Sequence, residues 1–183
     1  MKVIKETIDG LLSFQPDIYE DARGYFYEQF NQNKYKESGI SLNFVQDNVS
    51  FSKKNTLRGL HFQVNKPQGK LVQVMQGQVY DVAVDIRQGS PTFGKWVGKI
   101  LSHENKTQFY IPPGFAHGFY VMSETALFMY KCTDFYSSKD DRGTLWSDND
   151  LGIPWPNTEQ PIISEKDQKL PNFKHIDFSE KIF

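Results

Sequence analysis

Short runs of strand-forming residues recur along this chain, separated by Gly, Pro, Asn and Asp, which favour turns. This pattern is typical of a β-barrel or a β-sandwich. No internal repeat, low-complexity tract or Ser/Gly linker divides the 183 residues, so we predict one all-β domain over residues 1–183. The expected strands are residues 11–19, 24–30, 44–51, 56–62, 70–76, 78–87, 95–101, 107–111, 117–121 and 126–135.

Two short helices are expected beside the strands. Residues 33–38 precede Gly39, and a glycine at that position commonly ends a helix. Ser164 is followed by Glu165 and Asp167, which is the pattern of an N-cap and an acidic first turn. We therefore expect the tail from about residue 164 to be partly helical.

The charge of the chain is nearly balanced. The formal net charge is −1 at pH 7 and the pI is about 6.4, so no overall field attracts nucleic acid or an anionic membrane. The single cysteine, Cys132, cannot form an intrachain disulfide, and we interpret it as a small core residue. Since no signal peptide precedes Met1 and no long apolar run occurs, we expect a cytoplasmic protein.

The run at residues 79–87 alternates between apolar and charged side chains. Tyr80, Val82, Val84 and Ile86 share one face of the expected strand, and Asp81 lies on the other face with further charged residues. If the apolar face packs between two sheets, the charged face meets either solvent or the mouth of a barrel.

The segment from Leu57 to Lys70 carries the strongest indication of chemistry. Arg58, His61 and Lys70 lie there among apolar residues and glycine. Two cations and a group that titrates near neutral pH suit an anionic substrate that loses a proton beside a carbonyl. The alternative for His61 is a hydrogen-bonded structural histidine. Strand alternation separates Arg58 from His61, unless Gly59 carries a bulge that redirects them.

Pro112, Gly114 and His117 have the spacing P-x-G-x-x-H, which fits the second motif of the cupin barrels. A metal-binding cupin also needs an H-x-H pair and a glutamate. This chain has His61-Phe62-Gln63 instead, and its remaining histidines lie in a polar turn and in the tail. The number of available ligands therefore disfavours a metal-dependent oxygenase.

Three further segments present polar side chains. Tyr130 lies in a strand-like run, where a packed amphipathic tyrosine is the alternative to a functional one. Residues 134–142 form a polar loop that would close one end of a barrel. Arg23 precedes a strand that carries Glu28. Two interpretations of this pattern remain open. The residues form a surface salt bridge, or the guanidinium of Arg23 recognises a diphosphate oxygen.

In this order the motifs resemble those of the dTDP-4-dehydrorhamnose 3,5-epimerases, cupin-fold enzymes of deoxysugar nucleotide synthesis. The resemblance runs from about Phe14 to the turn at residues 164–167. Its carriers are Asp21-x-Arg23-Gly24-x-Phe26-x-Glu28, Gln46-Asp47-Asn48, Leu57-Arg58-Gly59-Leu60-His61-x-Gln63, Gln68-Gly69-Lys70-Leu71-Val72, Asp81-Val82-Ala83-Val84-Asp85-Ile86-Arg87, Ser90-Pro91-Thr92-Phe93-Gly94, Pro113-Gly114-Phe115-Ala116-His117-Gly118-Phe119 and Arg142-Gly143-x-x-Trp146.

The resemblance implies a role for each matching residue. His61 matches the catalytic base, Asp167 the carboxylate paired with it, Tyr130 the acid on the opposite face of the sugar, and Lys70 a lysine beside the developing enolate. The residues that match nucleotide-sugar contacts are Arg23, Glu28, Gln46, Asn48, Arg58, Lys70, His117, Asp141 and Lys166, and Tyr136 matches a tyrosine that stacks on thymine. Asp141 departs from the glutamate that is more usual at its position.

The implied reaction is epimerisation at carbons 3 and 5 of dTDP-4-dehydro-6-deoxy-D-glucose. Hydrogens beside a ketone are acidic because the carbanion delocalises onto the carbonyl oxygen, so the reaction needs a base, an oxyanion stabiliser and a proton source. It needs no cofactor and no metal.

The expected partners are the nucleotide sugar and a second copy of the chain. The family forms dimers in which an N-terminal strand joins the partner's sheet, and here the segment before about residue 21 would do so. The alternatives are a mono-epimerase at carbon 3 or 5, a 3,4-ketoisomerase and a non-catalytic sugar-binding cupin.

Overall fold

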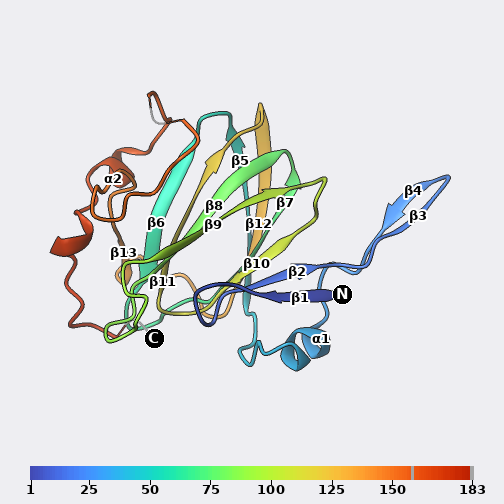
Figure 1. The fold of residues 1–183 in the computed structure, drawn as a ribbon, viewed down its shortest axis with the longest axis horizontal. Helices are drawn as coiled ribbons and strands as arrows, with labels where there is room; N and C mark the ends of the chain where they lie inside the picture. Colours follow the sequence, from blue (N-terminus) through green and yellow to red (C-terminus); the bar gives the residue numbers. More distant parts are fainter. Residues whose placement is uncertain (158, 182–183) are drawn as a thin grey trace.

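The computed structural model describes residues 1–157 and 159–181, and strands dominate it (Figure 1). The strands are β1 (Lys2–Lys5), β2 (Leu12–Gln15), β3 (Tyr19–Asp21), β4 (Gly24–Phe26), β5 (Gln46–Lys53), β6 (Leu57–Gln63), β7 (Lys70–Gln76), β8 (Gln78–Asp85), β9 (Trp96–Ser102), β10 (Gln108–Ile111), β11 (Phe115–Val121), β12 (Thr125–Cys132) and β13 (Asp141–Gly143). The helices are α1 (Gln32–Glu37), α2 (Glu165–Gln168) and the 3-10 helix η1 (Phe173–His175).

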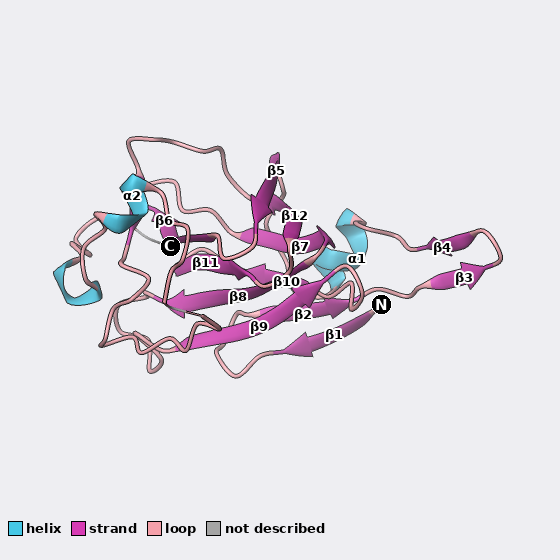
Figure 2. Ribbon diagram, turned by 90° about the horizontal axis from the view of Figure 1, so that it is seen from above, coloured by secondary structure: helices cyan, strands magenta, loops and turns pink. Residues whose placement is uncertain are grey.

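Two antiparallel sheets face each other and enclose the main core (Figures 1 and 2). One has six strands in the order β1-β2-β10-β7-β12-β5, and the other has five in the order β13-β6-β11-β8-β9. Val72 and Phe109 from the first sheet pack against Ala83 and Phe119 from the second. Neighbouring strands are mostly distant in sequence, which is the connectivity of a jelly-roll barrel. The predicted cupin-type jelly roll is therefore confirmed.

Each predicted strand overlaps an observed one, but several limits differ. The run at residues 70–76 coincides with β7, whereas the run at 11–19 splits because Pro16 follows β2 and cannot donate a backbone hydrogen bond. The run at 126–135 ends earlier, at Cys132. Strands β1 and β13 and helix η1 were not predicted.

The alternation in β8 is confirmed, and its charged face looks into the barrel, one of the two expected placements, but the expected placement of its apolar face is wrong. Val82 and Val84 do not lie between the sheets; they pack with Trp155 and Phe173 of the C-terminal tail, on the outer face of the five-stranded sheet. Asp81 is fully buried, on the face that looks into the barrel. The tail covers the outer face and the other sheet covers the inner face, so the five-stranded sheet is buried on both sides.

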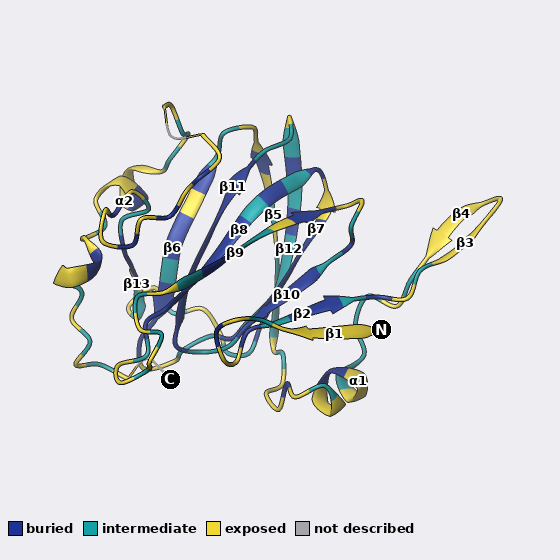
Figure 3. Cartoon of the chain, viewed as in Figure 1, coloured by how far each residue is buried: buried dark blue, intermediate teal, exposed yellow. Residues whose placement is uncertain are grey.

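The N-terminal segment contains the most exposed strands of the fold. Strand β2 pairs with β10 of its own chain and β1 forms the sheet edge, while the hairpin of β3 and β4 projects away from the barrel (Figures 1 and 3). Exchange of this segment into a partner's sheet stays a prediction.

Both expected helices form. Helix α1 lies within one residue of the expected range, and the amide oxygen of Asn31 caps it by accepting from the backbone N–H of Asn33. The hydroxyl of Ser164 caps α2 by accepting from the N–H of Asp167 at 3.1 Å. Within residues 1–157 and 159–181, no helix has the length and apolar character needed to cross a membrane.

Candidate active site

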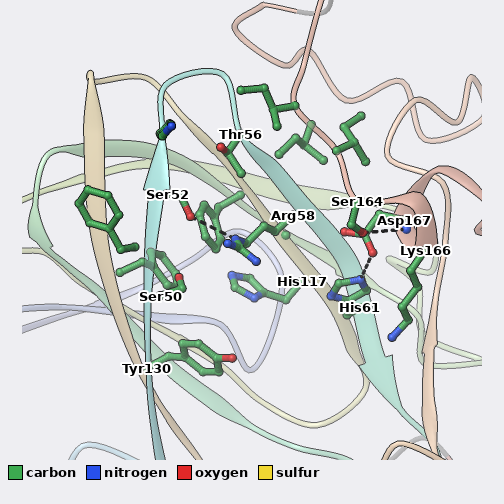
Figure 4. Close-up of a pocket in the computed structure, with 18 of the residues that line it drawn as sticks. Ser50, Ser52, Thr56, Arg58, His61, His117, Tyr130, Ser164, Lys166 and Asp167 are labelled. Atoms are coloured by element: carbon green, nitrogen blue, oxygen red, sulfur yellow. Dashed lines mark hydrogen bonds and ion pairs between the residues drawn. The ribbon is translucent and has the colours of Figure 1, made fainter.

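Two adjoining cavities lie where β5 and β12 of one sheet face β6 and β11 of the other, and Figure 4 shows the larger of the two. Their volumes are about 570 and about 320 Å³. His61, Lys70 and Tyr130 line both cavities, so they mark the junction. Asp167, Arg58, His117 and Lys166 line the larger cavity. The four residues predicted to be catalytic are therefore brought together at one place.

A bulge in β6 turns both Arg58 and His61 toward the larger cavity. The pairing of β6 with β11 shifts register, since His61 opposes His117 whereas Arg58 opposes Phe119. Gly59 lies in this bulge with φ +107°, and a Cβ there would stand 2.6 Å from the Cα of Gly118. The redirection suggested for Gly59 is confirmed, and only glycine fits the position.

His61 is oriented by a buried carboxylate from the C-terminal tail. Nε2 of His61 lies 2.8 Å from Oδ1 of Asp167, and Oδ2 of Asp167 accepts from the backbone N–H of Gly59 at 3.1 Å (Figure 4). Burial would raise the pKa of Asp167, but the hydrogen bonds from His61, Gly59 and Ser164 outweigh it and hold the pKa below its usual range. Because the carboxylate accepts from Nε2, the lone pair of neutral His61 lies on Nδ1.

Tyr130 and Lys70 come from adjacent strands of the other sheet. Figure 4 shows the phenol of Tyr130 reaching across the cavity toward His61. Burial raises the pKa of Tyr130, so its hydroxyl keeps its proton at neutral pH. Burial lowers the pKa of Lys70, which makes its ammonium a readier hydrogen-bond donor to an oxyanion.

A second histidine–carboxylate pair forms part of the cavity floor. Nε2 of His117 lies 2.8 Å from Oδ2 of the fully buried Asp81. The charged face of β8 therefore meets the barrel and not solvent, and Asp81 supports His117 from beneath the cavity. The ring of His117 also stacks near Phe128, which lines the same cavity.

The smaller cavity holds polar residues that share a hydrogen-bond network. The carboxylate oxygen Oδ2 of Asp141 accepts from Tyr136 Oη at 3.0 Å and from Lys166 Nζ. The amide of Gln46 donates to Asn48 at 3.1 Å, and its carbonyl accepts from the N–H of Tyr136 at 3.0 Å. The sequence-predicted residues Gln46, Asn48, Tyr136, Asp141 and Lys166 thus lie together.

Arg23 and Glu28 are not brought to either cavity by their own chain. Arg23 bonds Asp21 at 2.5 Å in the projecting hairpin and its side chain is 90% exposed. Glu28 pairs with Lys34 at 2.8 Å. Neither belongs to the described residues that line the two cavities.

Sequence reasoning missed several residues of the cavity wall. Ser50 and Ser52 line it from β5, where alternate residues beginning at Gln46 are partly or wholly buried and the others are exposed. The sequence signal that could have identified them is the alternation along β5, in which every second residue is polar and faces inward. Gln63 stood out from the sequence only as part of a motif, yet its amide oxygen accepts from the N–H of Ser137 at 2.7 Å and so holds the loop that carries Tyr136.

Cys132 is fully buried, as interpreted, and its sulfur accepts from the side-chain amide of Asn48. In the part of the chain that the structure describes, no three His, Cys, Asp or Glu side chains gather in a way that holds a metal ion.

A jelly-roll barrel whose cavity joins a histidine–carboxylate pair, an amine and a phenol defines a cupin isomerase that moves protons at carbon. A family model described as dTDP-4-dehydrorhamnose 3,5-epimerase matches residues 5–175. This chain belongs to that family of isomerases.

Individual relatives agree with this assignment. The dTDP-4-dehydrorhamnose 3,5-epimerase of Shigella flexneri is 52% identical over 180 residues, which cover 97% of this chain and 99% of that protein. The crystal structure of a dTDP-6-deoxy-D-glucose-3,5-epimerase from Legionella pneumophila, in complex with dTDP-4-keto-L-rhamnose, has 54% identity and a TM-score of 0.94, covering 96% of this chain and 94% of its own. A 3'-monoepimerase from Streptomyces bikiniensis, in complex with dTDP-quinovose, has 32% identity and a TM-score of 0.86, covering 91% and 85%.

Proposed function

We propose that this protein converts dTDP-4-dehydro-6-deoxy-D-glucose to dTDP-4-dehydro-L-rhamnose by inverting carbons 3 and 5. The observation that carries the proposal is the placement of His61, with Asp167 behind it, across a cavity from Tyr130, with Lys70 at the junction. A base on one face of a sugar and an acid on the other is the arrangement that inversion requires.

His61 begins the reaction by removing a proton beside the ketone. Nδ1 of the imidazole takes the proton, and the resulting imidazolium is stabilised by the ionised Asp167. Carbons 3 and 5 both flank the carbonyl at carbon 4, so one base on one face serves both positions in turn.

The electron pair left on carbon moves onto the carbonyl oxygen. Lys70 donates a hydrogen bond to this enolate oxygen, and the ring of His117, held by Asp81, lines the same wall. A preorganised donor of this kind commonly contributes about 3–4 kcal/mol to the transition state.

Tyr130 completes the inversion by returning a proton to the opposite face. Its raised pKa keeps the phenol protonated before the step, and afterwards solvent restores the proton of Tyr130 and takes the proton held by His61, so that both groups are ready for the second carbon. The enolate collapses to the ketone with the carbon inverted.

The nucleoside lies in the smaller cavity, where we assign thymine stacking to the exposed ring of Tyr136 and further contacts to Gln46, Asn48 and Asp141. Lys166 and Arg58 contact the nucleotide sugar from the adjoining larger cavity, and we assign a diphosphate contact to Arg58. Nucleic acid and membranes are not partners in this proposal.

We also propose that the working unit is a homodimer in which the N-terminal segment joins the partner's sheet. Phe26 of the hairpin is 68% exposed, and Val49 on the outer face of the six-stranded sheet is 63% exposed. Apolar surface of this kind is usually covered by another chain. In such a dimer Arg23 and Glu28 act at the partner's cavity. Since Cys132 is a buried free thiol, we place the enzyme in the reducing cytoplasm.

The test is incubation with dTDP-4-keto-6-deoxyglucose in heavy water, followed by NMR. The proposal predicts deuterium at both carbon 3 and carbon 5 and the L-rhamno product. Deuterium at one carbon alone indicates a mono-epimerase, the second candidate, which the likeness to the Streptomyces bikiniensis enzyme favours. A 4-keto sugar that moves its ketone to carbon 3 indicates a ketoisomerase, and a complete lack of exchange indicates a sugar-binding protein.

A further inference from the structure

The loop that carries Tyr136 is held by hydrogen bonds more than by apolar contacts. It joins β12 to β13 over residues 133–140 and contains no helix or strand. The side chains of Phe135 and Tyr136 are 61% and 56% exposed, so their burial contributes little to fixing the loop. The hydrogen bonds of the loop backbone therefore decide where the ring of Tyr136 lies.

The side chain of Gln63 bonds the backbone on both sides of Tyr136. Its amide oxygen Oε1 accepts from the N–H of Ser137 at 2.7 Å, and its Nε2 donates to the carbonyl oxygen of Phe135 at 3.3 Å. Nε2 also donates to the carbonyl oxygen of Lys66, in the loop between β6 and β7, at 2.8 Å. The amide thereby ties two loops to strand β6, and both of its N–H groups are used.

The same strand carries the proposed base. Gln63 lies two residues after His61, so both side chains leave β6 on the same face. Gln46 and Gln68 each make one bond to the backbone of the Tyr136 loop, whereas Gln63 makes two. Gln63 is also only 4% exposed, so with both N–H groups occupied it has little to offer a ligand directly.

We propose that Gln63 is a positioning residue, which fixes the ring of Tyr136 against the nucleobase and so sets the affinity for the nucleotide. The inference rests on the proposed function, which assigns the base to Tyr136.

Gln63→Met tests this role, because methionine has a similar size and shape but cannot donate a hydrogen bond and accepts one only weakly. Calorimetric titration with dTDP should show a Kd raised by about tenfold. On dTDP-4-keto-6-deoxyglucose, KM should rise by the same factor while kcat stays within about twofold, since the bond between His61 and Asp167 is untouched. An unchanged Kd, or a fall in kcat as large as the rise in KM, overturns the proposal.

A double-mutant cycle with Tyr136→Ala separates an indirect role of Gln63 from a direct one. If Gln63 acts through the ring of Tyr136, Gln63→Met should not weaken dTDP binding further in the Tyr136→Ala background, since the ring is already gone. The same weakening in both backgrounds overturns the proposal, because Gln63 then acts on the ligand or on the rest of the site.

Gln63→Asn is the second variant, in case Gln63→Met does not fold. It keeps an amide in the strand but is one methylene shorter, so the amide falls short of the loop. Its Kd for dTDP should also rise, and a folded Gln63→Asn with an unaltered Kd overturns the proposal.

Asn105→Ala is the matched control. The amide of Asn105 also bonds three backbone groups, since it accepts from the N–H groups of Ser102 and Thr107 and donates to the carbonyl oxygen of Ile100. Asn105 is not among the described residues that line the two cavities. This variant should lower the unfolding temperature and leave the Kd for dTDP unchanged. A comparable rise in Kd overturns the proposal, because general loosening of the fold then accounts for both variants. If the unaltered protein neither binds dTDP nor exchanges deuterium, the proposed function is refuted instead.

Discussion

Nε2 of His61 lies 2.8 Å from Oδ1 of Asp167, although 106 positions separate the two residues in the chain. The contact joins the tail to the barrel strand β6, since the same carboxylate also accepts from the backbone N–H of Gly59. The catalytic geometry therefore depends on how the C-terminal tail docks.

Asp167→Asn should retain the fold but remove the negative charge that stabilises protonated His61. We expect deuterium exchange at carbons 3 and 5 to slow by about 10²- to 10⁴-fold, with little change in dTDP affinity. Asp148→Asn is the control, because Asp148 is equally buried but accepts from the N–H groups of Leu151 and Phe173. It should lower the unfolding temperature and leave the exchange rate of folded enzyme intact. Equal exchange rates in the two variants contradict the role of Asp167.

Gly59→Ala tests whether the bulge in β6 aligns Arg58 and His61. Its Cβ would stand 2.6 Å from both the Cα of Gly118 and the carbonyl oxygen of His117. Gly89→Ala is matched for backbone strain, since Gly89 has φ +80° but nothing within 4 Å of the added Cβ. We expect Gly89→Ala to cost about 1–2 kcal/mol of unfolding free energy. Gly59→Ala should cost roughly 1–3 kcal/mol more and abolish exchange. If Gly59→Ala and Gly89→Ala lose similar amounts of unfolding free energy in denaturant and keep similar activities, the bulge does not align these residues.

Asp85 lies away from the cavity and should make the free energy of unfolding depend on pH in the acid range. Burial would raise the pKa of this fully buried carboxyl, but Arg87, Ser90 and Thr92 donate to it and lower the pKa from 3.8 to about 2. Because the folded pKa lies below the unfolded one, the contribution is present at neutral pH and is lost as the pH falls from about 4 through 2. Asp85→Asn should lower the free energy of unfolding, measured in urea at pH 7, by about 2 kcal/mol. The difference in unfolding free energy between the variant and the unaltered protein should become smaller toward pH 3. A deficit that is constant with pH excludes this linkage.

Arg23 offers a test of the exchanged dimer. Arg23→Ala should be weakly active and His61→Ala inactive, because each leaves every cavity of its own homodimer incomplete. Unfolding and refolding the two together forms mixed dimers in which one cavity has His61 from one chain and Arg23 from the other. We expect recovery of about a quarter of the unaltered activity. If the mixture is no more active than its parts, Arg23 does not act across the interface. Two variants of one chain segment, Arg23→Ala and Glu28→Ala, are the control and should not complement each other.

Much of the barrel was predictable from sequence because its strands obey local rules. Strand β7 was predicted with its observed limits, since turn residues flank a continuous β-prone run. Strand β1 was missed because its four residues are all exposed and carry no inward pattern. The apolar face of β8 was misplaced because nothing local indicates that Trp155, far along the chain, covers it.

Residues of the site were predictable from the sequence only where their side chains suggested a chemical role. His61 and Lys70 stood out as polar groups in an apolar run, whereas Asp167 was indicated by the resemblance alone, since spacing gives no hint of a contact across 106 positions. Ser50 was missed for another reason. On β5 the polar residues face inward, so the usual rule that apolar residues face the interior failed at a substrate cavity.

The division of labour between His61 and Tyr130 is the central claim, and one measurement tests it most directly. Substrate is incubated in heavy water with Tyr130→Phe or with His61→Ala, and the recovered sugar nucleotide is read by NMR. We predict that Tyr130→Phe returns substrate that carries deuterium with its configuration retained, because His61 still removes and replaces protons on its own face, whereas His61→Ala returns substrate without deuterium. Deuterium in the substrate recovered from His61→Ala, with none from Tyr130→Phe, would contradict the account.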